Sequence, residues 1–300
     1  MSGECEAVDT SCCASCGIPE IDDIKLVPCD GCDLVKYCGD DCRREHNLQH
    51  EEACNKRAAE LRDEILFKQP ESSHNGDCPI CSLPLSFDRE KSSMCYSCSK
   101  VICKGCVFAN TKREREGRLA HTCPFCREPA PKTKEALRKL LMKRIAANDP
   151  VAMCFEGIEQ FSKGDYLSTL ECLTKAAALG DAEAHWRLAR MYIIGKGVEK
   201  DEGKIIYHLE EAAIGGHPHA RYVLGAHEWE TGKNEKAVKH WIIAATQGED
   251  EAIKELLKAF KEGFMKKEVL AATLRAHKAA VDATKSPQRR AAAVFFRESA

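Results

Sequence analysis

Cysteine pairs are the residues of this chain most able to do chemistry. All but two of its 19 cysteines lie within the first 126 of 300 residues. Most of them form pairs whose members are separated by two or three residues. With this spacing a tight turn or one helical face directs two side chains at a single metal ion. The start, MSGECEAVDT, is not a signal peptide, so we expect an intracellular, reducing setting, cytoplasmic or nuclear. There, this cysteine density indicates metal binding rather than disulfides.

The first run supplies eight candidate ligands between residues 13 and 54. In chain order they are Cys13, Cys16, Cys29, Cys32, Cys38, Cys42, His50 and Cys54. Eight ligands suffice for two tetrahedral zinc ions. Few large apolar side chains lie between them, so metal binding must supply folding energy, on the order of 10 kcal/mol per site. Two choices stay open, because Cys12 is an alternative to Cys13 and His46 shares a helical face with His50.

This first run resembles the MYND zinc finger. The family pattern ends in an aromatic-Cys-x3-Cys-x7-His-x3-Cys segment, which here reads YCGDDCRREHNLQHEEAC. The resemblance implies interleaved sites, with one zinc ion held by Cys13, Cys16, Cys38 and Cys42. The other ion is then held by Cys29, Cys32, His50 and Cys54. The resemblance also implies a protein-interaction module that takes short proline-containing peptides.

A second run of ligands fills residues 78–126 and contains only cysteines. They are Cys78, Cys81, Cys95, Cys98, Cys103, Cys106, Cys123 and Cys126. Only four residues separate the two middle pairs, which favours interleaved sites over independent ones. Two sequential zinc ribbons and a rubredoxin-type iron site are the alternatives. His121 lies near Cys123, and we interpret it as a bystander because eight sulfurs already complete two sites.

With its CPIC and CPFC knuckles, the second run resembles the all-cysteine variant of the RING domain. The resemblance implies one ion on Cys78, Cys81, Cys103 and Cys106, and the other on Cys95, Cys98, Cys123 and Cys126. It also implies contacts with a ubiquitin-conjugating enzyme through Ile80, Pro124 and Arg127. Such a domain positions the ubiquitin thioester and contributes no nucleophile. Many active members carry Trp shortly after the sixth ligand, where this chain has Val107 and Phe108.

The remaining sequence is helical by pattern and repeats. The segments KAAALGDAEA, EAAIGGHPHA and IAATQGEDEA align, and their final alanines follow Ala152 at spacings of 32, 36 and 32 residues. A small residue follows each of the first three alanines by five positions. These residues are Gly157, Ala189 and Gly225, and they allow paired helices to approach closely. Such a period predicts an α-solenoid. The segment AHWRLARMYIIGKGVEKDEGKIIYHLEEAAIGG resembles the Sel-one-like repeat, which implies about four repeats and a surface for protein partners.

The sequence therefore predicts a multidomain chain, with two small zinc-stabilised α+β fingers followed by an all-α solenoid of helix pairs. The expected parts are a disordered start (1–12), the first finger (13–54), a helical connector and linker (55–77), the second finger (78–130), the repeats (134–284) and a C-terminal helix or tail (285–300). We expect Val294, Phe295 and Phe296 to pack on the last repeat. We expect an apolar stripe to pack on the first repeat; it comprises Leu137, Leu140, Leu141 and Ile145.

The composition and charge of the chain argue against several classes of function. A net charge of −2 provides no bulk attraction to nucleic acid or an anionic membrane, and no stretch is apolar enough to cross a bilayer. No Ser-His-Asp or Cys-His nucleophile pattern stands out. Two hypotheses from different classes remain, and both require four zinc ions. One is a RING-type ubiquitin ligase that recruits substrates through the first finger and the repeats, and the other is a non-catalytic zinc-finger scaffold that binds protein partners.

Overall fold

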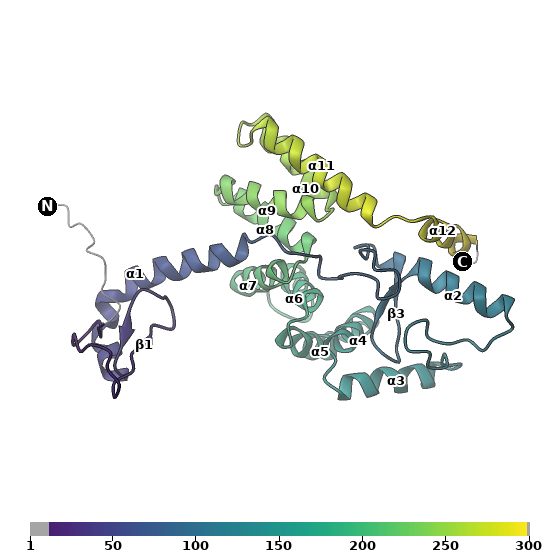
Figure 1. Cartoon of the computed structure of the whole chain (residues 1–300), viewed down its shortest axis with the longest axis horizontal. Coiled ribbons are helices and arrows are strands. Elements are labelled where there is room, and N and C mark those ends of the chain that lie inside the picture. The colour runs from purple at the N-terminus through teal and green to yellow at the C-terminus, as the bar shows by residue number, and fades with distance from the viewer. Residues whose placement is uncertain (1–11, 299–300) are drawn as a thin grey trace. The chain divides into compact units, whose positions relative to one another are not determined.

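The computed structural model (Figure 1) describes residues 12–298, which divide into two compact units between Lys68 and Gln69. In the first unit, β1 (Val27–Pro28) pairs antiparallel with β2 (Lys36–Tyr37). α1 (Asp40–Leu66) follows as one continuous helix. The sequence predicts a helical connector after the finger, and because no Gly or Pro interrupts residues 40–66, one helix runs through both the finger and the connector.

The second unit begins with a finger built on a short hairpin. The 3-10 turn η1 (Arg89–Lys91) leads into β3 (Ser92–Met94), which pairs antiparallel with β4 (Val101–Cys103). α2 (Lys104–Glu116) follows directly. The buried core of this finger holds only two apolar side chains, Leu85 and Ile102, beside three cysteines. So small a core needs another source of stability, as the ligand pattern predicts.

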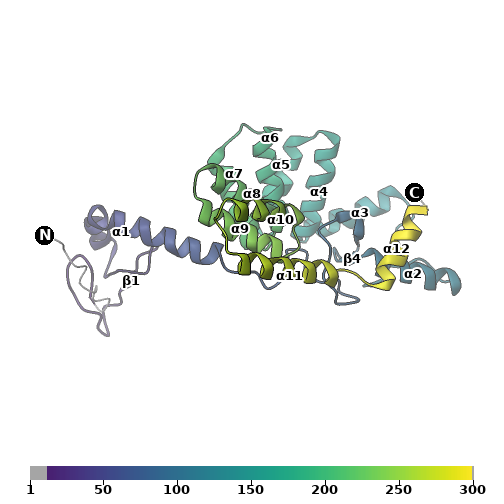
Figure 2. The ribbon, with the colours of Figure 1, turned by 90° about the horizontal axis from the view of Figure 1, so that it is seen from above.

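A helix and four helix pairs complete the solenoid, and Figure 2 shows its pairs stacked side by side. The first helix is α3 (Lys134–Ala146). The pairs are α4 (Pro150–Lys163) with α5 (Tyr166–Ala178), α6 (Ala182–Ile194) with α7 (Glu202–Ile214), α8 (Pro218–Glu230) with α9 (Asn234–Thr246), and α10 (Asp250–Lys261) with α11 (Lys267–Ala283). This order of fingers followed by an all-helical solenoid confirms the predicted fold class. The predicted docking of α3 is also confirmed, because Leu141 is buried and Ile145 packs against the core of the first pair.

An N-terminal cap recurs at the first helix of each pair. The side chains of Asp149, Asp181, His217 and Glu249 accept hydrogen bonds from the first turns of α4, α6, α8 and α10. Such caps satisfy backbone N–H groups that have no partner within the helix. Histidine at the third cap is a departure from the acidic residues at the other three.

Small residues allow the paired helices to approach, as the repeat pattern predicts. A Cβ added at Gly225 on α8 would lie 2.4 Å from Nε1 of Trp241 on α9. Trp241 is almost fully buried and donates to the backbone oxygen of Tyr222 at 3.2 Å. The indole is therefore fixed against the glycine.

We expect Gly225→Ala to destabilise the repeats by about 1–3 kcal/mol, because the new methyl group has no space beside a fixed ring. Thermal unfolding followed by circular dichroism measures this. The matched control is Gly203→Ala in α7, where the nearest atom to an added Cβ is 3.5 Å away. That change should be neutral or stabilising by up to ~1 kcal/mol, because alanine favours a helix. Equal effects of the two substitutions would contradict the packing argument.

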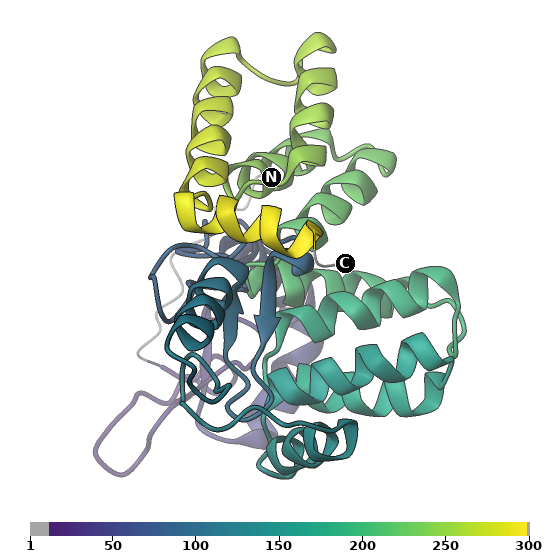
Figure 3. The ribbon, with the colours of Figure 1, turned by 90° about the vertical axis from the view of Figure 1, so that its right-hand side faces the viewer.

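The position of the C-terminal helix differs from the prediction. α12 (Pro287–Glu298) packs on α2 of the second finger instead of the last repeat, and Figure 3 shows it crossing that finger. The ring centroids of Phe295 and Phe108 lie 5.0 Å apart, and Ala292 is fully buried. Gly105 allows this approach, because a Cβ there would lie 2.9 Å from Cγ of Arg289. α2 thus offers both a glycine and an aromatic ring to receive the tail.

The linker before the second finger lies against the repeats. The backbone N–H of His74 donates to the oxygen of Gly216 at 3.0 Å. Gln247 Nε2 donates to the backbone oxygen of Ser72 at 3.4 Å. These contacts fix the polar segment that the composition marks as a linker.

Candidate metal centres and the cleft beside them

The first cluster of the first finger contains Cys13, Cys16, Cys38 and Cys42, whose sulfurs lie within 4.8 Å of one another. Cys38 follows β2, and Cys42 lies in the first turn of α1, so the sheet and the helix together position this pair. The Sγ atoms of Cys16 and Cys38 are 3.6 Å apart, as are those of Cys38 and Cys42. Cys12, the alternative to Cys13, lies outside the cluster.

The second cluster of this finger contains Cys29, Cys32, His50 and Cys54. Nε2 of the buried His50 lies 3.1 Å from Sγ of Cys32, and the sulfurs of Cys29 and Cys54 are 3.6 Å apart. His46 is not part of it, because its Nδ1 bonds to the hydroxyl of Tyr37 at 3.1 Å. The groups implied by the MYND resemblance are therefore the groups that the fold brings together.

In the second finger, one complete cluster joins a knuckle to the start of α2. It contains Cys78, Cys81, Cys103 and Cys106. The Sγ atoms of Cys78 and Cys106 are 3.8 Å apart, and so are those of Cys81 and Cys103. Cys95 and Cys98, which lie between these pairs in sequence, belong to the other cluster. The two clusters are therefore interleaved.

In the other cluster of the second finger, only three of the four predicted ligands lie close together. Cys95, Cys98 and Cys123 lie within 4.8 Å of one another. The exposed Cys126 instead has its Sγ 3.1 Å from Oγ of Ser97. His121, interpreted from the sequence as a bystander, is outside the cluster and contacts Glu114.

These clusters fit zinc. Four sulfurs at about 2.3 Å from a tetrahedral ion lie about 3.8 Å from one another, and the sulfur pairs above are separated by 3.6 to 3.8 Å. A disulfide has an S–S length near 2.05 Å, and every cysteine in residues 12–298 is a free thiol. The three clusters with four protein ligands are structural sites, because a catalytic zinc keeps one position for water.

The pKa values of the thiols within one cluster favour binding of a divalent cation. Burial would raise the pKa of Cys13, but backbone N–H groups of Cys16, Cys38 and Ser15 lower it to about 6. Hydrogen bonds with its cluster partners, Cys16 foremost, raise the pKa of Cys38 to about 12. One thiolate therefore suppresses ionisation of its neighbour. A bound Zn²⁺ removes that opposition, since its charge stabilises every thiolate around it.

The three residues that the sequence assigns to a conjugating enzyme lie on the knuckles of the second finger. The side chain of Ile80 is 43% exposed. Pro124 is half-buried, and Arg127 is exposed. Phe125, which the sequence analysis did not single out, occupies the same place in the last knuckle as Ile80 does in the first and is also 43% exposed. Aligning the CPIC and CPFC patterns would have identified Phe125 from the sequence.

Arg127 is oriented by a buried polar network. Its guanidinium donates to Oδ1 of Asn110 on α2 at 3.2 Å, and Asn110 Nδ2 donates to Glu114 at 2.8 Å. Glu114 is almost fully buried and accepts from the backbone N–H and the hydroxyl of Thr122. Burial opposes ionisation, but hydrogen bonds from Thr122, His121 and Asn110 lower the pKa of Glu114 to about 2. The carboxylate thus ties α2 to the last knuckle.

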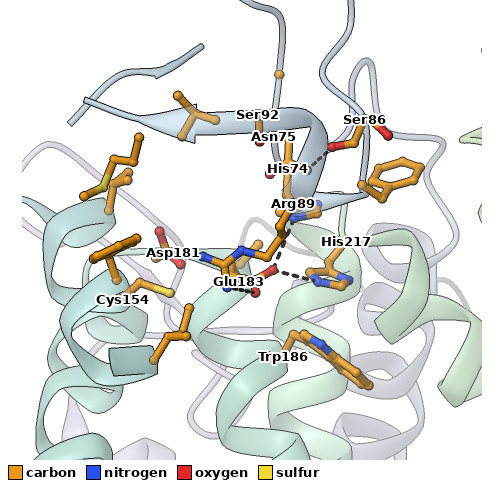
Figure 4. A pocket seen from close by; sticks show the side chains of 18 of the residues that line it. His74, Asn75, Ser86, Arg89, Ser92, Cys154, Asp181, Glu183, Trp186 and His217 are labelled. Atoms are coloured by element: carbon orange, nitrogen blue, oxygen red, sulfur yellow. Dashed lines mark hydrogen bonds and ion pairs between the residues drawn. The ribbon is translucent and has the colours of Figure 1, made fainter. Parts of the chain in front are cut away.

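A second polar cluster lies in the cleft between the second finger and the repeats, shown in Figure 4. Nε2 of His217 and Nε2 of His74 lie 3.2 Å and 3.5 Å from the same oxygen of Glu183. Arg187 bonds to the other oxygen at 2.6 Å. Burial raises the pKa of Glu183, but hydrogen bonds from His217 and His74 hold it well below its usual range. Glu183 is therefore a carboxylate surrounded by donors.

The tautomer of His217 makes this cluster a poor metal site. Its Nδ1 accepts from the backbone N–H of Ala220 at 3.2 Å, as part of the helix cap. Burial lowers its pKa to about 4, so the ring is neutral and carries its one proton on Nε2. That nitrogen donates to Glu183 and has no lone pair for a metal. The cluster is a polar tie between the linker and the repeats.

The fold and sites thus define a protein with two cysteine-rich fingers and an α-solenoid of helix pairs. Residues 13–54 match the MYND finger family, and residues 146–181, 182–217 and 218–249 each match the Sel1 repeat. Both are protein-interaction domains. Among the curated proteins no significant match was found. None of the helices in residues 12–298 is long and apolar enough to cross a membrane.

The solved structures that are similar to the chain include two bacterial proteins. One is a Sel1 repeat protein from Oxalobacter formigenes, at 22% identity and a TM-score of 0.43, with 59% of this chain and 52% of that chain covered. The other is c5321, a protective antigen of uropathogenic Escherichia coli strains with an SLR fold, at 20% identity and a TM-score of 0.37. There the match covers 56% of this chain and 37% of that one. The chain therefore spans about half or less of the length of each.

Proposed function

We propose that residues 78–130 are a RING-type domain and that the chain is an intracellular ubiquitin ligase. In this proposal the MYND finger (13–54) and the repeats (134–284) recruit protein substrates. The observation that carries it is the interleaving of the second finger, where the complete four-cysteine cluster takes the first and third pairs while Cys95, Cys98 and Cys123 group separately. Four ions are then held by the sixteen ligands that the sequence indicates.

The exposed knuckle tips support a docking role. Ile80 and Phe125 expose large apolar side chains at equivalent places in the two outer knuckles, with Pro124 beside Phe125. A patch of exposed apolar side chains is typical of interaction surfaces, and in this proposal the knuckle tips form such a patch. Arg127 directly follows the last knuckle and adds a planar group with several donors, suited to contacting two proteins at once.

The proposed reaction is aminolysis of a thioester. The amine of a substrate lysine attacks the ubiquitin carbonyl carbon, the carbon–sulfur bond breaks, and the cysteine of the conjugating enzyme leaves as a thiolate. The nitrogen gives up a proton as the amide forms. The finger contributes no group to these bonds. Ile80, Pro124 and Arg127 instead restrict the position of the loaded enzyme, and orientation of this kind is a large source of rate acceleration.

A specific contact favours the alternative function, a non-catalytic scaffold. Phe108 follows the sixth ligand, where many active members carry a tryptophan, and it is packed against Phe295 of α12. A ring covered in this way is less available to a conjugating enzyme. Under this alternative the second finger stabilises the chain, while the MYND finger and the repeats bind partners.

Binding to a panel of purified conjugating enzymes tests the proposal. We expect at least one to bind the zinc-loaded chain, and Ile80→Ala to weaken that binding by about 10-fold, since apolar anchors dominate such interfaces. Leu119→Ala is the matched control, because Leu119 is exposed on the same finger but outside the knuckles. The scaffold alternative predicts no binding to any member of the panel.

A further inference from the structure

The cleft of Figure 4 has a volume of about 970 Å³ and lies within the second unit. One side is formed by η1, β3 and the residues around them. The other is formed by residues 151–158 of α4, residues 182–187 of α6 and the start of α8, with Cys154, Glu183 and His217 among the lining side chains. The cleft therefore joins the second finger to three successive repeats.

An edge of the β3–β4 sheet borders this cleft. Ser92, Ser93 and Met94 all line it. Successive side chains of a strand point to opposite faces, so three consecutive lining residues indicate that β3 runs along the cleft, and Val101 of β4 lines it beside Met94. Within residues 12–298 no further strand pairs with that edge, because the sheet has two strands.

The hydrogen-bonding register shows which backbone groups this edge presents. The N–H of Cys95 donates to the oxygen of Lys100 across the hairpin. Residues of an antiparallel strand alternate between facing the partner strand and facing away. Met94 therefore directs its N–H and C=O away from β4, and Ser92 directs its C=O the same way. The N–H of Ser92 already donates to the oxygen of Arg89.

A second observation also points to a ligand. Nδ1 of His74 is buried and has no hydrogen-bond partner, and the side chain is only 8% exposed. The ring is fixed, since it stacks on His217 at 4.2 Å and its Nε2 faces Glu183. A buried polar nitrogen without a partner is costly, and a backbone hydrogen-bonding group of a ligand would satisfy it.

The lining carries charged side chains of both signs, so it has no strong preference for an anion or a cation. Glu183 is paired with Arg187, and His219 contacts Glu249 at 3.2 Å. Asp77, Asp181, Arg89 and Lys100 add both signs to the lining. Apolar side chains supply much of the remaining lining, among them Phe87, Met94, Tyr96, Val101, Phe155, Ile158 and Trp186. The cleft therefore combines apolar walls with backbone groups that are free to pair.

We propose that this cleft binds an extended peptide segment of a partner protein, which pairs with β3 as a third strand. Only an extended backbone offers N–H and C=O groups at the spacing that a strand edge presents. Side chains on one face of such a peptide would contact Trp186 and its apolar neighbours, so we expect apolar residues at alternate positions. This proposal does not depend on ligase activity.

Selection from a phage-displayed library of random peptides, panned on the zinc-loaded full chain, supplies the probe. A selected peptide is then synthesised with a fluorophore, and its binding is measured by anisotropy. Met94→Pro removes the outward N–H, a change that an edge strand accommodates, and should weaken binding at least about 10-fold. Met94→Leu retains both the N–H and an apolar side chain, so it should weaken binding far less than Met94→Pro does. Zinc content and circular dichroism verify that both variants are folded.

N-methylation of the peptide provides a test that leaves the protein unchanged. Methyl groups placed on successive peptide nitrogens should weaken binding at alternate positions only, because a strand pairs through every second residue. Failure to select any peptide would overturn the proposal. So would binding that is indifferent to both Met94→Pro and N-methylation, or binding that has no alternating pattern.

Discussion

Removal of residues 285–300 is expected to open the second finger and to make its zinc readily available to a chelator. α12 buries Ala292 and packs Phe295 on Phe108. Arg289 donates to the backbone oxygens of Pro84, Leu83 and Thr284 and lies 3.5 Å from Sγ of Cys81. The helix thus completes a domain whose own apolar core is small.

Arg289→Ala isolates the polar part of this effect. Each hydrogen bond from a charged group contributes about 1.5–3 kcal/mol, so we expect a loss of about 2–4 kcal/mol and zinc transfer to a metallochromic chelator at least about 10-fold faster. Arg290→Ala is the matched control, because that side chain is exposed on the same helix. Equal zinc-transfer rates in the parent, Arg289→Ala and the truncated chain would show that α12 does not stabilise the finger.

Cys78→Ser should have the largest effect among the ligand substitutions. Its sulfur is completely buried in the core of the second finger, beside Ile102 and two other ligands, Cys103 and Cys106. Serine is a poor zinc ligand, and the core has few other contacts, so we expect both ions of this finger to be lost. Native mass spectrometry should then count two zinc ions per chain instead of four.

Cys126→Ser is the matched comparison. Cys126 is exposed, and its sulfur lies outside the tight group that Cys95, Cys98 and Cys123 form. We expect this variant to retain at least three ions, because the buried four-cysteine cluster remains whole. Loss of two ions from Cys126→Ser, or retention of three by Cys78→Ser, would contradict this order of importance.

Local sequence patterns predicted the two fingers, their metal clusters and the solenoid. Ligand pairs two or three residues apart, the family resemblances and a 32-residue period indicated the fingers, the clusters and the solenoid. The four-residue spacings of Cys38–Cys42 and His50–Cys54 indicated the helix that carries them. These features depend on neighbours within one turn or one repeat, so the sequence records them directly.

The contacts that the sequence did not predict join distant segments. Arg289 reaches the oxygen of Pro84 across 205 positions, and Gln247 reaches that of Ser72 across 175. Neither has a periodic pattern. His217 is different, because it occupies the cap position that Asp149, Asp181 and Glu249 fill in the other repeats. Aligning the caps of the repeats would have identified it as a departure and a candidate for a special contact.

Discharge of ubiquitin from a loaded conjugating enzyme onto free lysine tests the central proposal most directly. The chain, with four zinc ions verified by mass, is assayed beside Ile80→Ala and Arg127→Ala. The ligase proposal predicts faster discharge with the parent, little or none with Ile80→Ala, and a reduced rate with Arg127→Ala, which retains the docking contact but loses the planar donors. No acceleration with any conjugating enzyme, from protein that holds all four ions, would contradict it and favour the scaffold.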